Sequence, residues 1–235
     1  MDALLLTPIA IIHSPFKEKF ATPRQAGLTP SVKARVEFLP EYSSAESVRG
    51  LEGFSHIWLL FVFHQHVDQG WSPTVRPPRL GGNRRVGVFA SRSPFRPNPI
   101  GLSAVTLLDI HSKAGVLTLE VQGADLIDGT PIIDIKPYIP YADSIPAAQD
   151  GFAISEPQPC LEIRFSDKAR RKLVNFFAQA PELETLIRET LSLDPRPAYR
   201  HQKDDQHSYG CRLDRFNIRW QVAGTHVMIS DIEVD

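Results

Sequence analysis

The chain has 235 residues, 42% of them hydrophobic, and its 26 basic and 27 acidic side chains give a formal net charge of −1. This length and composition suit a globular protein with one large domain, or with a medium domain and a smaller one. A net charge so close to zero argues against a protein that binds nucleic acid over its whole surface by bulk electrostatics.

The start of the chain has neither the basic region nor the cleavage site of a secretory signal, and no run approaches the ~20 apolar residues of a membrane span. The two cysteines, Cys160 and Cys211, are far apart in the sequence and match no metal-ligand spacing. Reduced, packed thiols are therefore expected. We expect a cytoplasmic protein without membrane contact.

Short runs with strand character, separated by Gly, Pro, Asn or Asp, dominate the first 140 residues. The expected strands span residues 6–12, 33–39, 57–63, 86–90, 103–110, 116–121 and 131–135. Segment 57–63 is apolar at every position. This predicts either a strand covered on both faces or an interior strand with one face against a second subunit.

A different pattern begins after Pro157. Segment 160–165 predicts a strand, and segments 167–180 and 181–192 predict two helices. Alternation over 209–222 and 227–234 predicts a closing hairpin with its turn near Gly224. The fold is therefore expected to be mainly β, with one domain over residues 1–155 and a small α+β domain over residues 156–235.

Three loops concentrate polar side chains that a scaffold alone does not require. In the first, residues 14–25, charged and aromatic residues interleave directly after a strand, a position that suits ligand contact.

The second loop is an arginine segment, defined here as residues 76–96. It contains Arg76, Arg79, Arg84, Arg85, Arg92 and Arg96 and neither Asp, Glu nor Lys. Guanidinium groups grip phosphates bidentately, and the ring of Phe95 offers a surface on which a base could stack. The alternative is a solvated arginine loop.

The third loop, residues 125–138, carries three carboxylates, and Asp128-Gly129 is a strong turn signal that would also suit a plain hairpin. Alternation places Asp134 on the face opposite its isoleucine neighbours, and Lys136 projects to the same side. The pair could be structural or could belong to a site.

Histidines at positions 13, 56, 64 and 66 raise the possibility of a metal site. No second His-x-His, Cys-x-x-Cys or His-Glu-x-x-His element accompanies them, so we expect no metal. Gly-x-Gly-x-x-Gly and Walker-type loops are also absent from the sequence. A nucleotide-like cofactor would have to bind in some other way than in a doubly wound fold or a P-loop.

The three loops, in this order, resemble the TsaA-like family of TrmO-type tRNA methyltransferases. The matching strings are residues 14–20, 22–25, 53–58, 92–101, 128–131 and 134–138. The likeness covers roughly residues 5–143, and segments 194–200 and 216–220 resemble the longer bacterial members.

The resemblance implies a single-sheeted β-barrel that works as a homodimer. It also implies methyl transfer from S-adenosylmethionine to N6 of threonylcarbamoyladenosine beside the anticodon of a threonine tRNA. Carried over by motif, the cofactor contacts are Pro23, Arg24, Gln25, His64, Gln65, Arg92, Leu102, Asp128, Gly129, Thr130 and Pro131.

Because the sulfonium already activates the methyl group, the enzyme needs chiefly to align donor and acceptor. An acylated N6 must also lose its proton, so a general base would help, and Asp134 and Tyr138 are the candidates. The residues expected to hold the anticodon stem-loop are Arg76, Arg79, Arg84, Arg85, Phe95, Arg96, Tyr199 and Arg200.

Two other functions remain open at this point. The arginines and aromatic residues would also serve an RNA-binding module without enzymatic activity. A metal-dependent hydrolase built on His13, His56, His64 and His66 is the second alternative.

Overall fold

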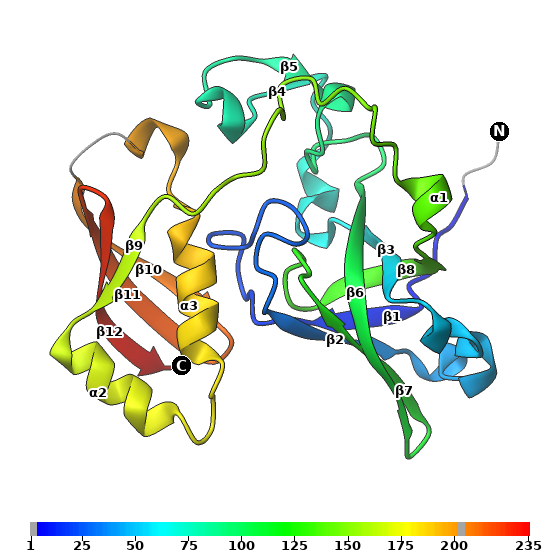
Figure 1. Ribbon diagram of the computed structural model, residues 1–235. Coiled ribbons are helices and arrows are strands. Elements are labelled where there is room, and N and C mark those ends of the chain that lie inside the picture. The colour runs from blue at the N-terminus through cyan, green and yellow to red at the C-terminus, as the bar shows by residue number, and fades with distance from the viewer. Residues whose placement is uncertain (1–3, 202–204) are drawn as a thin grey trace.

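The computed structural model describes residues 4–201 and 205–235, so the first three residues of the predicted N-terminal domain lie outside the described residues. Six strands close into an antiparallel barrel in the order β1-β2-β7-β6-β3-β8, and a four-stranded sheet follows it in the chain (Figure 1). The barrel strands are β1 Ala10–His13, β2 Lys33–Phe38, β3 His56–Val62, β6 Ile100–Lys113, β7 Val116–Gln122 and β8 Thr130–Pro137. The expected fold class, a single-sheeted barrel followed by a small α+β domain, is confirmed.

The barrel core follows from period-2 patterning, which sends alternate side chains inward. In β3 the inward residues Ile57, Leu59 and Phe61 are buried, whereas Trp58 and Leu60 on the outer face are half-buried. The outer face of this uniformly apolar strand is therefore only partly covered within one chain.

Phe61 also explains the glycine at position 101. The Phe61 ring lies over Gly101 on the neighbouring strand β6, and a Cβ there would come within 2.2 Å of the ring. Any larger residue would displace the ring from the barrel core.

Three sequence-based expectations about strands were wrong. The first strand begins at Ala10 instead of residue 6, because Leu4–Leu6 find no strand partner and stay exposed. Segment 86–90 holds only β5, Val86–Gly87, which pairs with β4, Thr74–Val75, before a 3₁₀ turn over Val88–Ala90. Segment 209–222 is two strands, because Asp214 takes a positive φ of 53° and makes a turn.

The C-terminal sheet has the order β10-β11-β12-β9, with β9 parallel to β12 and helices packed against it (Figure 1). Its elements are β9 Glu162–Phe165, α2 Asp167–Phe176, α3 Leu183–Ser192, β10 Asp205–Leu213, β11 Phe216–Ala223 and β12 His226–Val234. The Ser166 hydroxyl caps α2 by accepting from the Ala169 amide at 3.2 Å, and α2 ends four residues before the expected 180. One further short helix, α1 Pro140–Asp143, follows the barrel.

The loop after β1 connects the barrel to the C-terminal sheet, and Figure 1 shows it reaching from one to the other. Phe16 forms a bridge with Leu213 and is buried in the C-terminal core. Phe20 stacks on Trp220 with ring centroids 6.2 Å apart, and the amide of Arg212 donates to Glu18 Oε1 at 2.9 Å. The first polar loop, which begins at the end of barrel strand β1, is therefore also fixed to the C-terminal sheet.

Candidate functional site

The first and third polar loops meet at Asp128. Its Oδ2 accepts from Lys17 Nζ at 2.9 Å and its Oδ1 accepts from the Ser14 amide at 3.0 Å. Gly129, with a φ of 77°, makes the turn that leads into β8. Asp128 thus lies at a crossing of two loops, about a third exposed and with lone pairs still available to a ligand.

The first loop, the arginine segment and β6 meet around Arg92. Arg92 Nη1 donates to Gln25 Oε1 at 2.5 Å, and its charge also acts on Asp125. Ser103 Oγ donates to Asp125 Oδ1 at 2.6 Å. Burial raises the pKa of the Asp125 carboxyl, although the Ser103 hydrogen bond and the Arg92 charge act in the opposite direction. The Arg92 guanidinium is therefore held by the Gln25 amide, and its charge acts on the Asp125 carboxyl.

Sequence reasoning assigned no role to Asp125 or Ser103. Asp125 was visible as one of three carboxylates in its loop, but no local pattern connects it with a serine 22 residues away. The pairing appears only when the barrel places β6 beside the loop after β7.

A third junction joins the first loop to the turn after β3. Lys19 Nζ lies 3.0 Å from His66 Nε2, and the His66 ring meets the Phe95 ring edge-on with centroids 5.2 Å apart. Burial, the Lys19 charge and His64 lower the pKa of His66, so a neutral imidazole accepts from the ammonium. Burial also lowers the pKa of His64. Phe95 is half-buried in this group, and its stacking role stays a prediction.

The C-terminal domain reaches the site next to Arg24. Although Arg24 is exposed, partial desolvation of its guanidinium lowers its pKa, against the opposing charge of Asp194. Asp194 is itself buried and accepts twice from Arg196, at 2.8 Å for each oxygen. The charge of a buried carboxylate of the second domain therefore acts on a residue expected to bind cofactor.

The other expected cofactor residues are spread around these junctions. Leu102 on β6 is 50% exposed, whereas Thr130 is buried and its Oγ1 donates to the Ile127 carbonyl at 2.6 Å. Pro131 lies opposite Ile11 in the β1–β8 pair. Pro23 is half-buried and Gln65 is exposed.

The two candidate bases lie further along β8. Asp134 Oδ2 pairs with Lys136 Nζ at 2.9 Å, as the alternation predicted, and its side chain is 44% exposed. Tyr138 packs on Trp58 with ring centroids 5.4 Å apart. Because β8 has eight residues and spans about 25 Å, Asp134 is closer than Tyr138 to the Asp128 turn. Both roles stay predictions.

The arginines of the arginine segment differ in their contacts. Arg96 Nη1 donates to the carbonyls of Val88 and Ser91, at 3.1 and 2.7 Å. Arg85 donates to Thr74 Oγ1 at 2.8 Å and Arg79 donates to the Ser155 carbonyl. Arg76, Arg84 and Arg92 are exposed, and in the second domain Tyr199 is exposed with the Arg200 guanidinium 5.8 Å from its ring centroid.

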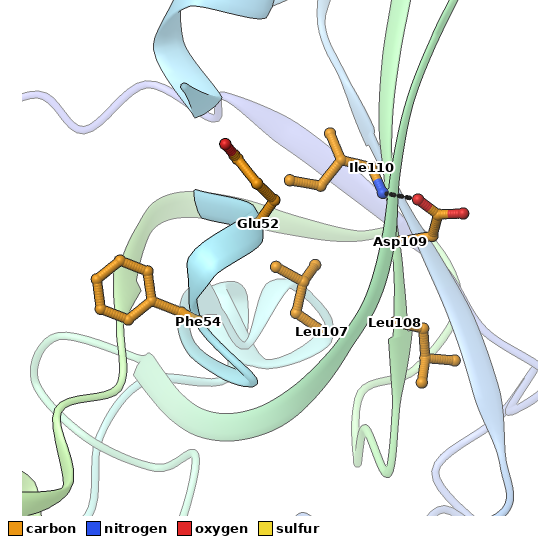
Figure 2. A pocket seen from close by; sticks show the side chains of 6 residues that line it. All are labelled: Glu52, Phe54, Leu107, Leu108, Asp109 and Ile110. Atoms are coloured by element: carbon orange, nitrogen blue, oxygen red, sulfur yellow. Dashed lines mark hydrogen bonds between the residues drawn. The ribbon is translucent and has the colours of Figure 1, made fainter. Parts of the chain in front are cut away.

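A surface hollow on the barrel lies outside these junctions. Its lining is Glu52, Phe54, Leu107, Leu108, Asp109 and Ile110, and Figure 2 shows the Asp109 carboxylate on the side of its strand away from Glu52 and Phe54. A volume of about 180 Å³ is small for a cofactor pocket. We therefore place the candidate site at the loops.

Within residues 4–201 and 205–235, no group of three or more His, Cys, Asp or Glu side chains is arranged to hold a metal ion. His56, for example, contacts Ser55 and Thr106, whereas His66 contacts Lys19. The same described part of the chain has no helix with the length and apolarity that a membrane crossing requires.

The described loops belong to two segments that match models of one family. Residues 11–144 match the tRNA-methyltransferase O N-terminal domain, and residues 158–235 match the TrmO C-terminal domain. The chain belongs to the tRNA-methyltransferase O (TrmO) family. Its matched N-terminal segment contains the Asp128, Arg92 and Lys19 junctions, and its matched C-terminal segment contains Asp194.

Individual TrmO relatives resemble the chain over nearly its full length. It is 47% identical to the tRNA (adenine(37)-N6)-methyltransferase of Escherichia coli K12, over 95% of both chains. A Pseudomonas aeruginosa protein, provisionally named an S-adenosylmethionine-dependent methyltransferase, is 44% identical over 92% of this chain and 91% of its own. The crystal structure of TrmO from Pseudomonas aeruginosa superposes with a TM-score of 0.78 at 36% identity, covering 99% of this chain and 100% of that one.

Proposed function

We propose that this TrmO family member is an S-adenosylmethionine-dependent tRNA (adenine(37)-N6)-methyltransferase that acts on threonylcarbamoyladenosine in threonine tRNA. The observation that carries the proposal is the 47% identity to a tRNA (adenine(37)-N6)-methyltransferase over 95% of both chains. The convergence of three separate polar loops at one end of the barrel supports it.

The chemistry of the loop residues fits the cofactor. Arg92 offers a guanidinium for an amino-acid carboxylate, Asp128 offers acceptors for ribose hydroxyls, and the exposed Leu102 offers an apolar surface for adenine. Bound S-adenosylmethionine would supply a methyl group that its sulfonium already activates. The Gln25 and Asp128 contacts hold these loops in place before any ligand arrives, which lowers the ordering cost of binding.

On the acceptor side, the loops must present N6 and remove its proton. Asp134 is the proposed base, and Lys136 at 2.9 Å orients its carboxylate. Tyr138 is the second candidate. Arg76, Arg79, Arg84 and Arg85, with Tyr199 and Arg200 of the second domain, would hold the phosphates and bases of the anticodon stem-loop.

The proposal includes two statements about organisation. The boundary between the methyltransferase domain and the C-terminal domain is placed between residues 155 and 156. The working form is a homodimer, supported by the half-buried apolar outer face of β3. A cytoplasmic location follows from the tRNA substrate.

The deciding experiment is methyl transfer in vitro with purified protein, S-adenosylmethionine and threonine tRNA, followed by mass spectrometry of the nucleosides. A mass gain of one methyl group on threonylcarbamoyladenosine is expected, and tRNA lacking the threonylcarbamoyl group is the control. Calorimetry with S-adenosylmethionine separates the enzyme from a simple RNA-binding module. Tight tRNA binding with neither cofactor heat nor methyl transfer would overturn the proposal.

A further inference from the structure

Phe89 is a solvent-exposed aromatic residue on a turn whose backbone is held by hydrogen bonds. Its side chain is 74% exposed, whereas the adjacent Val88 is 1% exposed. The 3₁₀ turn Val88–Ala90 is fastened by the Val88 amide, which donates to the Pro73 carbonyl at 3.0 Å, and by the Ser91 hydroxyl, which donates to the Val88 carbonyl at 2.9 Å. The buried Val88 therefore anchors the turn that presents the exposed ring.

Arg96 braces this turn and lies next to the ring. Its Nη1 donates to the carbonyls of Val88 and Ser91, on either side of Phe89, and its guanidinium carbon lies 5.6 Å from the Phe89 ring centroid. A cation at this distance is attracted by the electron-rich face of a ring. The Arg96 contacts thus hold the backbone of the turn and place a cation beside the Phe89 ring.

The position of the ring within the arginine segment, with the Arg96 guanidinium beside it, favours one class of partner. Phe89 lies inside the arginine segment, which contains six arginines and no Asp or Glu. A positive surface that also carries an exposed aromatic ring is the combination that binds unpaired nucleotides, with phosphates on the cations and bases on the ring. An apolar protein partner would gain little from the arginines.

We propose that Phe89 is the platform on which an unpaired base of the RNA substrate stacks, with Arg96 as the cation that supports it. The inference rests on the proposed function in one respect, namely that the substrate is an RNA with unpaired loop bases. It assigns the stacking role to Phe89, whereas the sequence had suggested Phe95, which already packs on His66 and Lys19.

The test measures binding of a fluorescent anticodon stem-loop RNA to the full chain. Phe89→Ala is expected to weaken binding about 10- to 100-fold, and Phe89→Trp to retain or strengthen it. Phe89→Leu keeps an apolar side chain without the aromatic face, so it is expected to behave like the alanine variant. Phe177→Ala is the matched control, because Phe177 is 66% exposed at the end of α2 and is expected to bind as the parent chain does.

The salt dependence distinguishes stacking from phosphate contact. Phe89→Ala removes no charge, so the slope of log affinity against log salt is expected to stay unchanged while the affinity falls. Affinity for S-adenosylmethionine is expected to be the same in all four variants. Each of three results would overturn the inference. These are RNA binding by Phe89→Ala as strong as that of the parent chain, full RNA binding by Phe89→Leu, and a changed oligomeric state of Phe89→Ala.

The same samples separate this inference from the proposed function. If the parent chain methylates tRNA and Phe89→Ala binds RNA normally, the stacking role is wrong and the enzyme assignment stands. If Phe89→Ala loses RNA binding and the parent chain transfers no methyl group, the platform stands and the enzyme assignment fails.

Discussion

Ser103 Oγ donates a 2.6 Å hydrogen bond to Asp125 Oδ1, and the carboxyl that accepts it has a pKa raised by burial. The charge of Arg92 acts on this carboxyl, and Arg92 in turn donates to Gln25. A carboxyl that is costly to ionise is therefore kept beside a guanidinium expected to bind the cofactor.

Asp125→Asn is expected to separate stability from function. A raised pKa in the folded state means that the contribution of Asp125 to stability is fully present below the unfolded pKa and is lost as pH rises through the folded pKa. The asparagine does not ionise and can still accept from Ser103, so the variant should melt at the same temperature or higher at neutral pH. Cofactor affinity should rise by up to about tenfold, which is about 1.4 kcal/mol, because the charge of Asp125 no longer competes with the cofactor carboxylate for Arg92. Melting curves between pH 4 and 8 and calorimetry measure the two effects.

Asp109→Asn changes an exposed carboxylate on β6, the strand that carries Ser103, and as the matched control it should change neither property. A large loss of stability in Asp125→Asn would show that the carboxyl has a structural role instead.

His66 is expected to make the site sensitive to acid. Its pKa lies below the ordinary value of 6.5 because of burial, Lys19 and His64. Its stabilising contribution is therefore present above the unfolded pKa and is lost as pH falls through the lowered folded pKa, where the protonated ring repels Lys19. Cofactor affinity should fall at pH values below 6.5, the ordinary value from which the His66 pKa is lowered. His66→Gln should remove this loss of cofactor affinity at acidic pH. His111 is an exposed histidine on β6, and His111→Gln should leave the loss unchanged.

Arg84→Ala combined with Arg85→Ala is expected to weaken tRNA binding through lost phosphate contacts. The slope of log affinity against log salt should decrease in magnitude by up to about 1.8, since each phosphate contact contributes about 0.7 to 0.9. Cofactor affinity should stay within about twofold of the parent value. Arg35→Ala combined with Arg49→Ala removes two exposed arginines outside the arginine segment and serves as the control. Equal slopes in both double variants would remove the RNA-binding role of Arg84 and Arg85.

Asp134→Asn is expected to slow methyl transfer about 10²- to 10⁴-fold if its carboxylate removes the N6 proton. Cofactor affinity should be unchanged, because Asp134 lies four residues along β8 from Thr130. Single-turnover kinetics at saturating cofactor measure the step directly. Lys136→Met keeps the Asp134 carboxylate and removes only its partner at 2.9 Å, so this variant should slow methyl transfer much less. Full turnover by Asp134→Asn would exclude Asp134 as the base and leave Tyr138.

Local patterns in the sequence predicted most strands and both long helices, because burial of alternate residues and helix capping depend on near neighbours. Ala34, Val36 and Phe38 in β2 are buried in alternation, and Ser166 caps α2. The predicted strand boundaries were wrong where a strand partner was missing, as at Leu4–Leu6, or where a turn interrupted the strand, as at Asp214. The Asp134–Lys136 pair was also predictable, since both lie on one strand two residues apart.

The sequence by itself determined the composition of the site: three polar loops, an arginine segment without carboxylates, and strings that resemble one family. Only the tertiary structure decided which of these residues meet. Asp125 contacts Ser103, Lys19 contacts His66, and Phe16 enters the C-terminal core, all through closure of the barrel and docking of the second sheet. The physical reason is that such contacts depend on how distant strands are ordered around the barrel, and no periodicity in a single segment encodes that order.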